Sequence, residues 1–209
     1  DGNDAITLNA ANGAALAEKL PHFSVNPGAG ATDVLNVNGA VTVTGDVTIT
    51  TRTIAFGGGS LTAGAANLVT LTATDAITDS AAGTDVTATS LVASAASGIS
   101  LDTNVVNLTA TNSTAGGIDL GEANALNVIS ISAAGQTVTL TAGGAITAGG
   151  VTEVTATTLS VTASGGIALD TAIANLTASN TTGGAIAISD VDGLTVTAGG
   201  VTNTGGAIT

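Results

Sequence analysis

The hexapeptide GIALDT at residues 166–171 has a near twin, GISLDT, at residues 98–103, which is an offset of 68 in the numbering. The text on either side of these hexapeptides repeats at the same offset, 68 or 69. Self-similarity at a fixed period is typical of repeat architectures, in which each unit packs on its neighbours. The sequence therefore predicts two repeat units, at about 68–136 and 137–204. The further matching stretches are LVTLTATDAIT (68–78) with TVTLTAGGAIT (137–147), VTAT (86–89) with VTAT (154–157), and NLTA (107–110) with NLTA (175–178).

A shorter rhythm runs inside each unit. Aliphatic residues recur every eight to ten residues in alternating triplets such as Leu159-Ser160-Val161, and Gly, Asn, Ser and Asp separate the triplets. A strand this short cannot bury its apolar side alone, but it can where the chain coils and each strand lies on the strand one coil earlier. This favours an all-β parallel β-helix, or β-solenoid, of about nine or ten coils of about 17 to 20 residues each, with about four coils in the 68-residue unit. An antiparallel sandwich also has regular short strands, but it does not explain near-identical text that recurs at one fixed offset.

The same rhythm predicts which side chains fill the core. Alternate side chains of a strand point to opposite faces, so one apolar column should face inward. With aromatic residues at only 1% of the chain, small and β-branched side chains must fill a thin core. The predicted inward residues are Leu91, Ile99, Leu108, Ile118, Leu126, Leu159, Ile167, Leu176, Ile186 and Leu194.

Composition changes near the N-terminus. Every Lys, Arg, His, Phe and Pro of the chain lies at or before Phe56. We expect an atypical N-terminal segment or cap at residues 1–35 and the β-helix at 36–209. Residues 12–20 are the one helix candidate, because Ala, Leu, Glu and Lys favour helix and Pro21 would end it. The Val–Thr stretches at 41–44 and 47–50 predict either a hairpin or two successive strands of a coil.

Charge and cysteine content exclude several classes of function. Two Lys and Arg against 15 Asp and Glu give a net charge of -13, which opposes binding to nucleic acid or to an anionic membrane. No stretch of 18 apolar residues predicts a membrane-spanning helix. The absence of Cys excludes disulfides, thiolate metal sites and a Cys nucleophile.

The sequence suggests no catalytic or cofactor-binding residues. The one His, His22, is expected in an exposed loop, and Arg52 alone could not both neutralise a uronate and act as a base. A polysaccharide-active β-helix enzyme is therefore an unfavoured alternative, and we expect a protein that is not an enzyme.

Acidic residues offer weak metal candidates. Asp102 and Asp170 hold equivalent positions in the two hexapeptides, where they could bind calcium or accept hydrogen bonds from the backbone of their own turns. Asp190 and Asp192 could pair in a loop, but the equivalent residues Glu122 and Asn124 keep half of that charge. We assign no metal residues and expect no cofactor, with calcium as the one open possibility.

Thr-x-Thr pairs suggest an alternative function. They occur at 70/72, 87/89, 139/141, 155/157 and 195/197, and both Thr of such a pair lie on the same side of a strand. Stacked in register on a flat face, they could order water as ice-binding solenoids do. The gaps between the pairs are uneven, however, with 17 residues from Thr70 to Thr87 and 16 from Thr139 to Thr155. We therefore favour the interpretation that Thr is simply the outward-facing residue of these strands.

The repeat phrases resemble the filamentous-haemagglutinin-like adhesins, which are large secreted bacterial exoproteins. TLTAGGAIT, GGIALDT and ANLTASN are similar to those chains in style and period over about residues 60–209. The resemblance implies a right-handed parallel β-helix, an extracellular location at the bacterial cell surface and a structural, filamentous or adhesive role. A host or cell-surface receptor would then be a partner.

The last five residues suggest a further partner. GGAIT at 205–209 repeats GGAIT at 143–147, a phrase from near the start of a unit. Natural solenoids cover their ends with a polar or helical cap, and no Pro, charge cluster or helix former lies near Thr209. We therefore expect the last coil to be continued by a neighbouring β-helical segment of a longer chain, or by further copies of the protein stacked head to tail.

Overall fold

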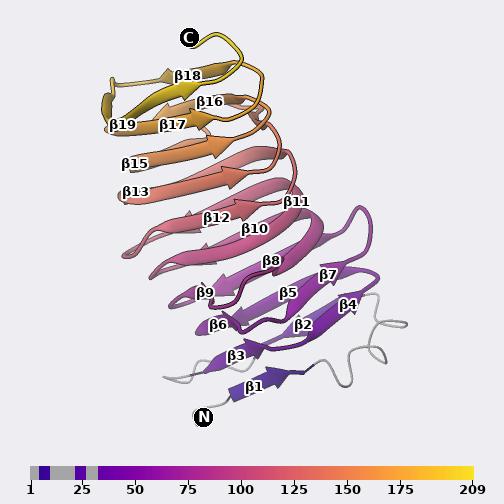
Figure 1. The fold of residues 1–209 in the computed structure, drawn as a ribbon. Helices are drawn as coiled ribbons and strands as arrows, with labels where there is room; N and C mark the ends of the chain where they lie inside the picture. Colours follow the sequence, from indigo (N-terminus) through magenta and orange to yellow (C-terminus); the bar gives the residue numbers. More distant parts are fainter. Residues whose placement is uncertain (1–4, 10–21, 27–32) are drawn as a thin grey trace.

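The chain winds into a stack of parallel β-coils. A computed structural model describes residues 5–9, 22–26 and 33–209, and these form 19 strands in one continuous ladder with about nine coils. Figure 1 shows the coils rising from the N-terminus at the bottom to the C-terminus at the top. The predicted all-β solenoid is confirmed.

Two columns of strands run the length of the stack. In the first column, each strand pairs in parallel with the strand of the next coil in the order β1 (Ala5–Leu8), β3 (Val34–Val37), β6 (Thr53–Phe56), β9 (Ile77–Asp79), β11 (Ile99–Asn112), β12 (Ile118–Glu122), β13 (Leu126–Ala142), β15 (Val154–Ala163), β17 (Asn175–Asn180) and β19 (Thr195–Asn203). The second column joins β2 (His22–Val25), β5 (Asp46–Thr51), β8 (Leu68–Ala73), β10 (Val86–Ala95), parts of β11 and β13, β14 (Ile146–Ala148), β16 (Ile167–Ala172) and β18 (Ile186–Asp190).

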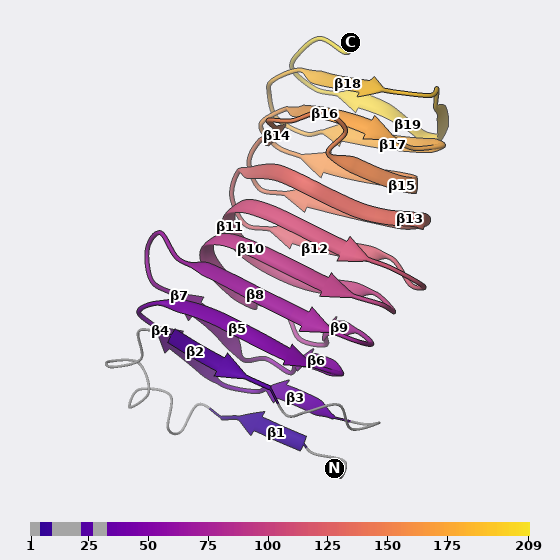
Figure 2. The same ribbon diagram turned by 180° about the vertical axis from the view of Figure 1, so that it is seen from behind.

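The two columns lie on opposite sides of the stack. β15, β17 and β19 face the viewer in Figure 1, whereas β16 and β18 come forward in the reverse view of Figure 2. A third, shorter column that includes β4 (Ala40–Val43) and β7 (Ser60–Ala63) continues into β10 and β11. Each coil therefore has two main faces joined by turns or by a short third side.

The 68-residue unit spans three and a half coils, so the prediction of about four is wrong. Ile99 lies in the first column, where three further coils lead through Ile118 and Val138 to Leu159. Its repeat counterpart Ile167 lies half a coil further on, in the second column. Repeated phrases therefore fall on opposite faces. The sequence period alone could not reveal this, because both main faces of the coil use the same alternating triplet.

Small and aliphatic side chains fill the core. Nine of the ten predicted inward residues are at most 3% exposed, and among the described residues Phe56 is the largest fully buried side chain. The exception is Leu194, which is only partly buried because it precedes β19 in the last coil, where no further coil covers it. The register prediction is otherwise confirmed.

The N-terminal predictions have mixed outcomes. β4 and β5 are successive strands of one coil rather than a hairpin, since they pair with β7 and β8 and not with each other. β1 and β2 already belong to the ladder, through β3 and β5. The helix candidate at 12–20 lies outside the described residues, and the boundary at residue 35 stays a prediction.

Candidate functional site

The first hexapeptide lies at a corner where three successive coils are joined by carboxylates. The backbone N–H of Asp102 donates a hydrogen bond to the carboxylate of Asp85 in the preceding coil, at 2.8 Å. The hydroxyl of Thr103 and the N–H of Val105 both donate to Oε2 of Glu122 in the following coil, each at 2.9 Å. Asp85, Thr103 and Glu122 are at most 5% exposed. We call this arrangement the first carboxylate corner.

The second hexapeptide builds the same corner again. The N–H of Asp170 donates to Oε2 of Glu153 at 2.9 Å, and the Thr171 hydroxyl and the N–H of Ile173 donate to Oδ1 of Asp190 at 2.8 and 3.0 Å. Each residue of this second carboxylate corner stands 68 positions after its counterpart. The twin phrase recurs because each copy is the middle layer of a three-coil hydrogen-bond network.

A buried Asn supports the start of each hexapeptide. Oδ1 of Asn112 accepts the N–H of Gly98, and its Nδ2 donates to the carbonyls of Ala115 and Gly116. Asn180 makes the corresponding bonds to Gly166, Gly183 and Gly184. The amide therefore ties the turn before the hexapeptide to the turn of the next coil.

Burial and hydrogen bonding move the carboxylate pKa values in opposite directions. Loss of solvation raises the pKa of Asp85 to about 7, and the negative charges of Asp79 and Asp102 add to the increase. Burial also raises the pKa of Glu122. Burial pushes the pKa of Asp190 up, but the bonds from Thr171, Ile173, Gly193 and Asp192 outweigh it and lower the pKa overall. The two corners thus share a geometry and differ in how readily they take up a proton.

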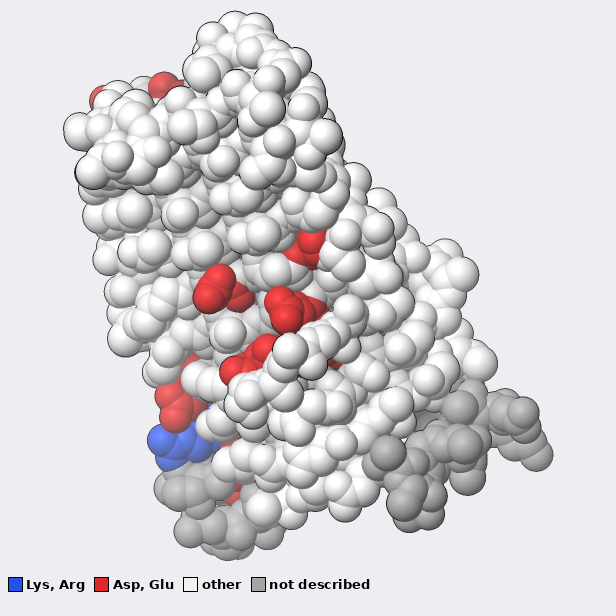
Figure 3. All heavy atoms as spheres, viewed as in Figure 1, with Lys and Arg blue, Asp and Glu red and all other residues white. Residues whose placement is uncertain are grey.

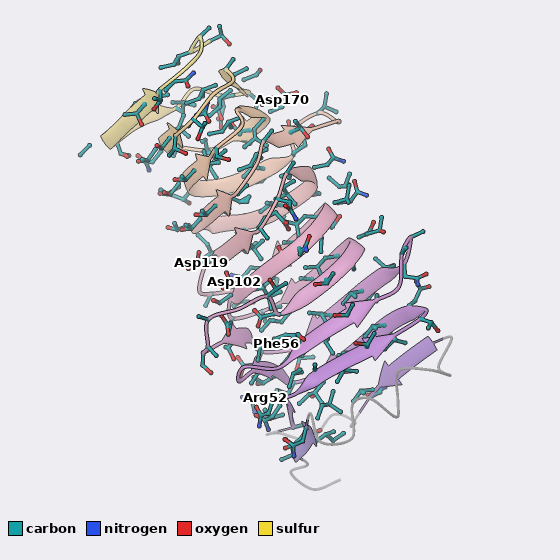
Figure 4. The ribbon with its side chains drawn as sticks, turned by 45° about the vertical axis from the view of Figure 1, so that its right-hand side comes forward. Arg52, Phe56, Asp102, Asp119 and Asp170 are labelled. Carbon is teal, nitrogen blue, oxygen red and sulfur yellow. The ribbon has the colours of Figure 1, made fainter. Side chains whose placement is uncertain are left out.

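The predicted candidates Asp102 and Asp170 lie far apart. Figure 4 shows Asp102 on one side of the stack and Asp170 higher up on the opposite side. Each lines a shallow groove, of about 270 Å³ beside Asp102 and about 310 Å³ beside Asp170. In both hexapeptides the corner bond uses the backbone N–H of the aspartate, not its carboxylate.

The described residues do not gather a metal-binding set. No three His, Asp or Glu side chains among residues 5–9, 22–26 and 33–209 are placed to hold one ion. Both oxygens of Asp190 are engaged, because Oδ2 accepts the N–H groups of Asp192 and Gly193. The equivalent Oε1 of Glu122 accepts the N–H of Asn124. These carboxylates accept hydrogen bonds from the backbone of their own loops.

The two cationic candidates from the sequence, Arg52 and His22, lie in the described part of the chain. A hydrogen bond from Ser97, together with the Arg52 guanidinium at 3.1 Å, lowers the pKa of Asp75. His22 lies in β2, so its expected placement in a loop is wrong, and its side chain is outside the description. No helix in the described part of the chain is long and apolar enough to cross a bilayer.

Hydroxyl side chains form two ordered arrays. In the second column, Thr and Ser of neighbouring coils lie side by side on the outer surface of β5, β8, β10, β11 and β13, with Val92 as an interruption. We call these residues the N-terminal hydroxyl array: Thr48, Thr50, Thr70, Thr72, Ser94, Thr109, Thr111, Ser130 and Ser132.

The C-terminal hydroxyl array lies on the other face. It follows the first column over β13, β15, β17 and β19, a region that is largely free of charge on the face shown in Figure 3. Its members are Thr139, Thr141, Ser160, Thr162, Thr177, Ser179, Thr197 and Thr202. Of the predicted pairs, 70/72 and 139/141 thus lie in arrays on opposite sides of the stack.

Comparisons with known proteins found no match for the chain. No protein-family model matches the sequence, and no curated protein and no solved structure shows significant similarity. The fold therefore defines the chain as a β-solenoid repeat protein.

Sequence reasoning named Glu122 and Asp190 but missed the other two carboxylates that bind the hexapeptides, Asp85 and Glu153. Asp85 and Glu153 are acidic at the same offset of 68, and Thr103 and Thr171 recur unchanged. The presence of an acidic residue at the same position of both units could have indicated a shared role. That role was not visible in the sequence, because Asp85 meets Asp102 only after the chain has completed a coil.

Proposed function

We propose that the chain is a non-catalytic structural or adhesive segment of an extracellular bacterial surface protein, in which the solenoid serves as a stiff rod. The observation that carries this is the use of the buried polar side chains. The buried carboxylates of Asp85, Glu122 and Glu153 all bind groups of a neighbouring coil, and the partly buried carboxylate of Asp190 does the same. Polar chemistry that an enzyme would direct toward a substrate is used here to join coils.

The ladder supports a rod of adjustable length. Strand pairing continues without a break from β1 to β19, and each coil adds one strand spacing of about 4.8 Å. In such repeats stability is roughly a sum over neighbouring interfaces, so coils can be added without a new core. A chain without Cys and with few charges suits the surface location that the resemblance implies.

Surface display tests this role. The chain is placed between an outer-membrane anchor and an antibody epitope on bacteria, and epitope exposure and retention on host cells are measured. We expect the epitope to project further than with the anchor alone, or the bacteria to adhere. Failure of both, or release of reducing ends from an acidic polysaccharide by the purified chain, would overturn the proposal.

Ice binding is a second candidate, favoured by the register of the hydroxyl arrays. Rows of Thr and Ser repeat at the strand spacing across the stack and every second residue along each strand. Some hydroxyls are already linked across coils, as Thr202 is to Ser179 at 3.2 Å. Such a lattice can hold ordered water, which makes hydrogen bonds nearly as good as direct ones.

Ice-crystal shaping at micromolar concentration tests this candidate. If the C-terminal array binds ice, Thr141→Lys should abolish shaping because it places a hydrated ammonium among the hydroxyls. Thr74→Lys, an exposed change outside both arrays, provides the control with the same charge. Round, unshaped crystals with the wild-type chain would exclude ice binding.

A further inference from the structure

A groove of about 350 Å³ crosses four successive coils beside the strands β9, β11, β12 and β13 of the first column. Three of its lining residues are glycines in the turns between coils. A Cβ at Gly116 would lie 2.4 Å from the carbonyl oxygen of Ser97, and a Cβ at Gly117 would lie 2.6 Å from that of Thr137. The close stacking of these turns requires residues without side chains and leaves a hollow on the surface. We call this hollow the polar groove.

One outward residue from each coil gives the polar groove a row of polar side chains. The row consists of Thr78, Ser100, Asp119 and Thr139. Ser100, Asp119 and Thr139 are partners in neighbouring strands, so the row advances by one strand spacing of about 4.8 Å per residue. None of the four side chains makes a hydrogen bond or an ion pair with another described residue. Their donors and acceptors are therefore available to a ligand.

The second unit has an equivalent groove without this row. It measures about 240 Å³ and lies beside β14, β16 and β18 in the second column. Ala168 and Ala187 stand there at the positions of Ser100 and Asp119, and they are partners in neighbouring strands in the same way. Since the solenoid forms in the second unit without the hydroxyl and the carboxylate, the comparison favours a binding role for these two groups.

The charges around the polar groove favour an uncharged ligand. Figure 4 shows Asp102 and Asp119 on the same side of the stack. Arg52 is the one Lys or Arg in the described part of the chain, and it is bonded to Asp75 at 3.1 Å. A uronate or a sulfate would therefore meet carboxylates with no cation to balance them. A sugar hydroxyl, in contrast, can donate a charge-assisted hydrogen bond to Asp119.

We propose that the polar groove binds an uncharged linear polysaccharide that runs along the stack. The carboxylate of Asp119 accepts hydrogen bonds from sugar hydroxyls, and the hydroxyls of Ser100 and Thr139 bind the sugars on either side. This inference rests on the adhesive role proposed above and names the class of its ligand. No aromatic residue lines the groove, so each contact is weak and adhesion depends on many copies at one surface.

Nuclear magnetic resonance titration of the purified 209-residue chain tests the proposal. The probes are uncharged linear hexasaccharides of glucose, mannose and N-acetylglucosamine, with a galacturonate hexasaccharide and hexalysine for comparison. We expect at least one uncharged probe to shift the backbone amide signals of Ser100, Asp119 and Thr139 in a saturable way. Absence of such shifts with all three uncharged probes, or binding of galacturonate or hexalysine alone, would overturn the proposal.

Variants of the polar row provide a second test. Ser100→Ala combined with Asp119→Ala gives the polar groove the alanines of the second unit. This double variant should bind about tenfold more weakly or worse, since a hydrogen bond to a charged group is lost. Asp192→Ala is the matched control, because Asp192 is exposed and does not line the groove. Equal loss of affinity in the two would assign the effect to net charge and contradict the proposal.

Circular dichroism checks that both variants are folded, as the alanines of the second unit lead us to expect. If the double variant does not fold, Asp119→Ala alone takes its place in the titration, with the same control. The display assay is independent of this result, because a rod that binds no sugar can still project an epitope.

Discussion

Thr103 and Thr171 show how a single hydroxyl can join two coils. Each is at most 2% exposed and donates to a carboxylate of the following coil. Loss of such a donor removes a hydrogen bond to a carboxylate, and at the buried Glu122 it also leaves the desolvation cost uncompensated. The recurrence of Thr at this position of the hexapeptide thus has a direct physical reason.

Replacing Thr171 by Val should destabilise the protein by about 1–3 kcal/mol, because the shape is kept and the bond to Asp190 is lost. Denaturant unfolding at pH 7 measures the change. Thr157→Val is the control, since Thr157 is exposed, and it should change stability by less than about 0.5 kcal/mol. Equal effects of the two substitutions would contradict the carboxylate-corner interpretation.

The raised pKa of Asp85 predicts an unusual pH dependence of the stability of the protein. Its pKa is about 7 in the folded protein and ordinary when unfolded, so the folded state holds the proton more tightly and stability falls as the pH rises from about 4 to 7. Asp85→Asn removes this loss and should be more stable than the wild type at pH 8, by a few kcal/mol, and similar at pH 4. Asn retains an oxygen that can accept the N–H of Asp102.

Thermal unfolding of both proteins between pH 4 and 8 checks this prediction. The lowered pKa values of Asp75 and Asp190 act in the other direction, since their contribution is lost as the pH falls below about 4. The wild type should therefore be most stable in mildly acidic solution. An Asp85→Asn variant that is equally destabilised at every pH would show that the ionised carboxylate is needed.

At the scale of the elements, turns decide how closely coils approach. Gly116 has a φ of +72°, and a Cβ at this position would lie 2.4 Å from the carbonyl oxygen of Ser97 in the preceding turn. In the second unit, a Cβ at Gly184 would lie at the same distance from the carbonyl oxygen of Gly165. These turns can stack only where the side chain is absent.

Gly116→Ala should therefore cost more than the about 1–2 kcal/mol that a left-handed conformation alone costs an L-residue. Gly135→Ala separates the two effects, because Gly135 has a φ of +81° and nothing within 4 Å of the added Cβ. Denaturant unfolding of the two variants measures the difference. If the two substitutions cost the same, close contact between the turns is not limiting.

At the scale of the whole molecule, the repeat of three and a half coils makes a deletion testable. Removing residues 98–165 joins Ser97 to Gly166, so the second hexapeptide replaces the first and Asp85 meets Asp170. Beyond the junction, strands of the first column take the places of second-column strands, and the reverse. This brings the remaining rows of both hydroxyl arrays to one face. Because both faces use the same strand pattern, we expect a folded, shorter solenoid.

Removal of residues 99–158 is the contrasting deletion. It takes out three whole coils, but it puts Ala163 in the place of Thr103 and so removes the bond to the following carboxylate. Circular dichroism melts should show a higher Tm for the 98–165 deletion. The opposite order would mean that column continuity matters more than the carboxylate corners.

The sequence by itself determined the class of fold and most of the core. The spacing of Leu91, Leu108 and Ile99 reflects strand alternation and coil length, both of which are local properties of the chain. The fixed offset between the two hexapeptides was likewise readable without coordinates. The sequence also determined which residues of each triplet point into the core, because a shift by one residue would turn every apolar side chain to solvent.

Only the tertiary structure decided what the repeated phrases do and where they lie. The half coil in the repeat depends on turn lengths that vary from coil to coil, and it places Asp102 and Asp170 on opposite sides. The bonds of Asp85 to Asp102 and of Glu122 to Thr103 join residues 17 and 19 positions apart. Such contacts arise from stacking one coil on another, so the pKa of Asp85 and the exposure of Val196 follow from the three-dimensional arrangement rather than from the local sequence.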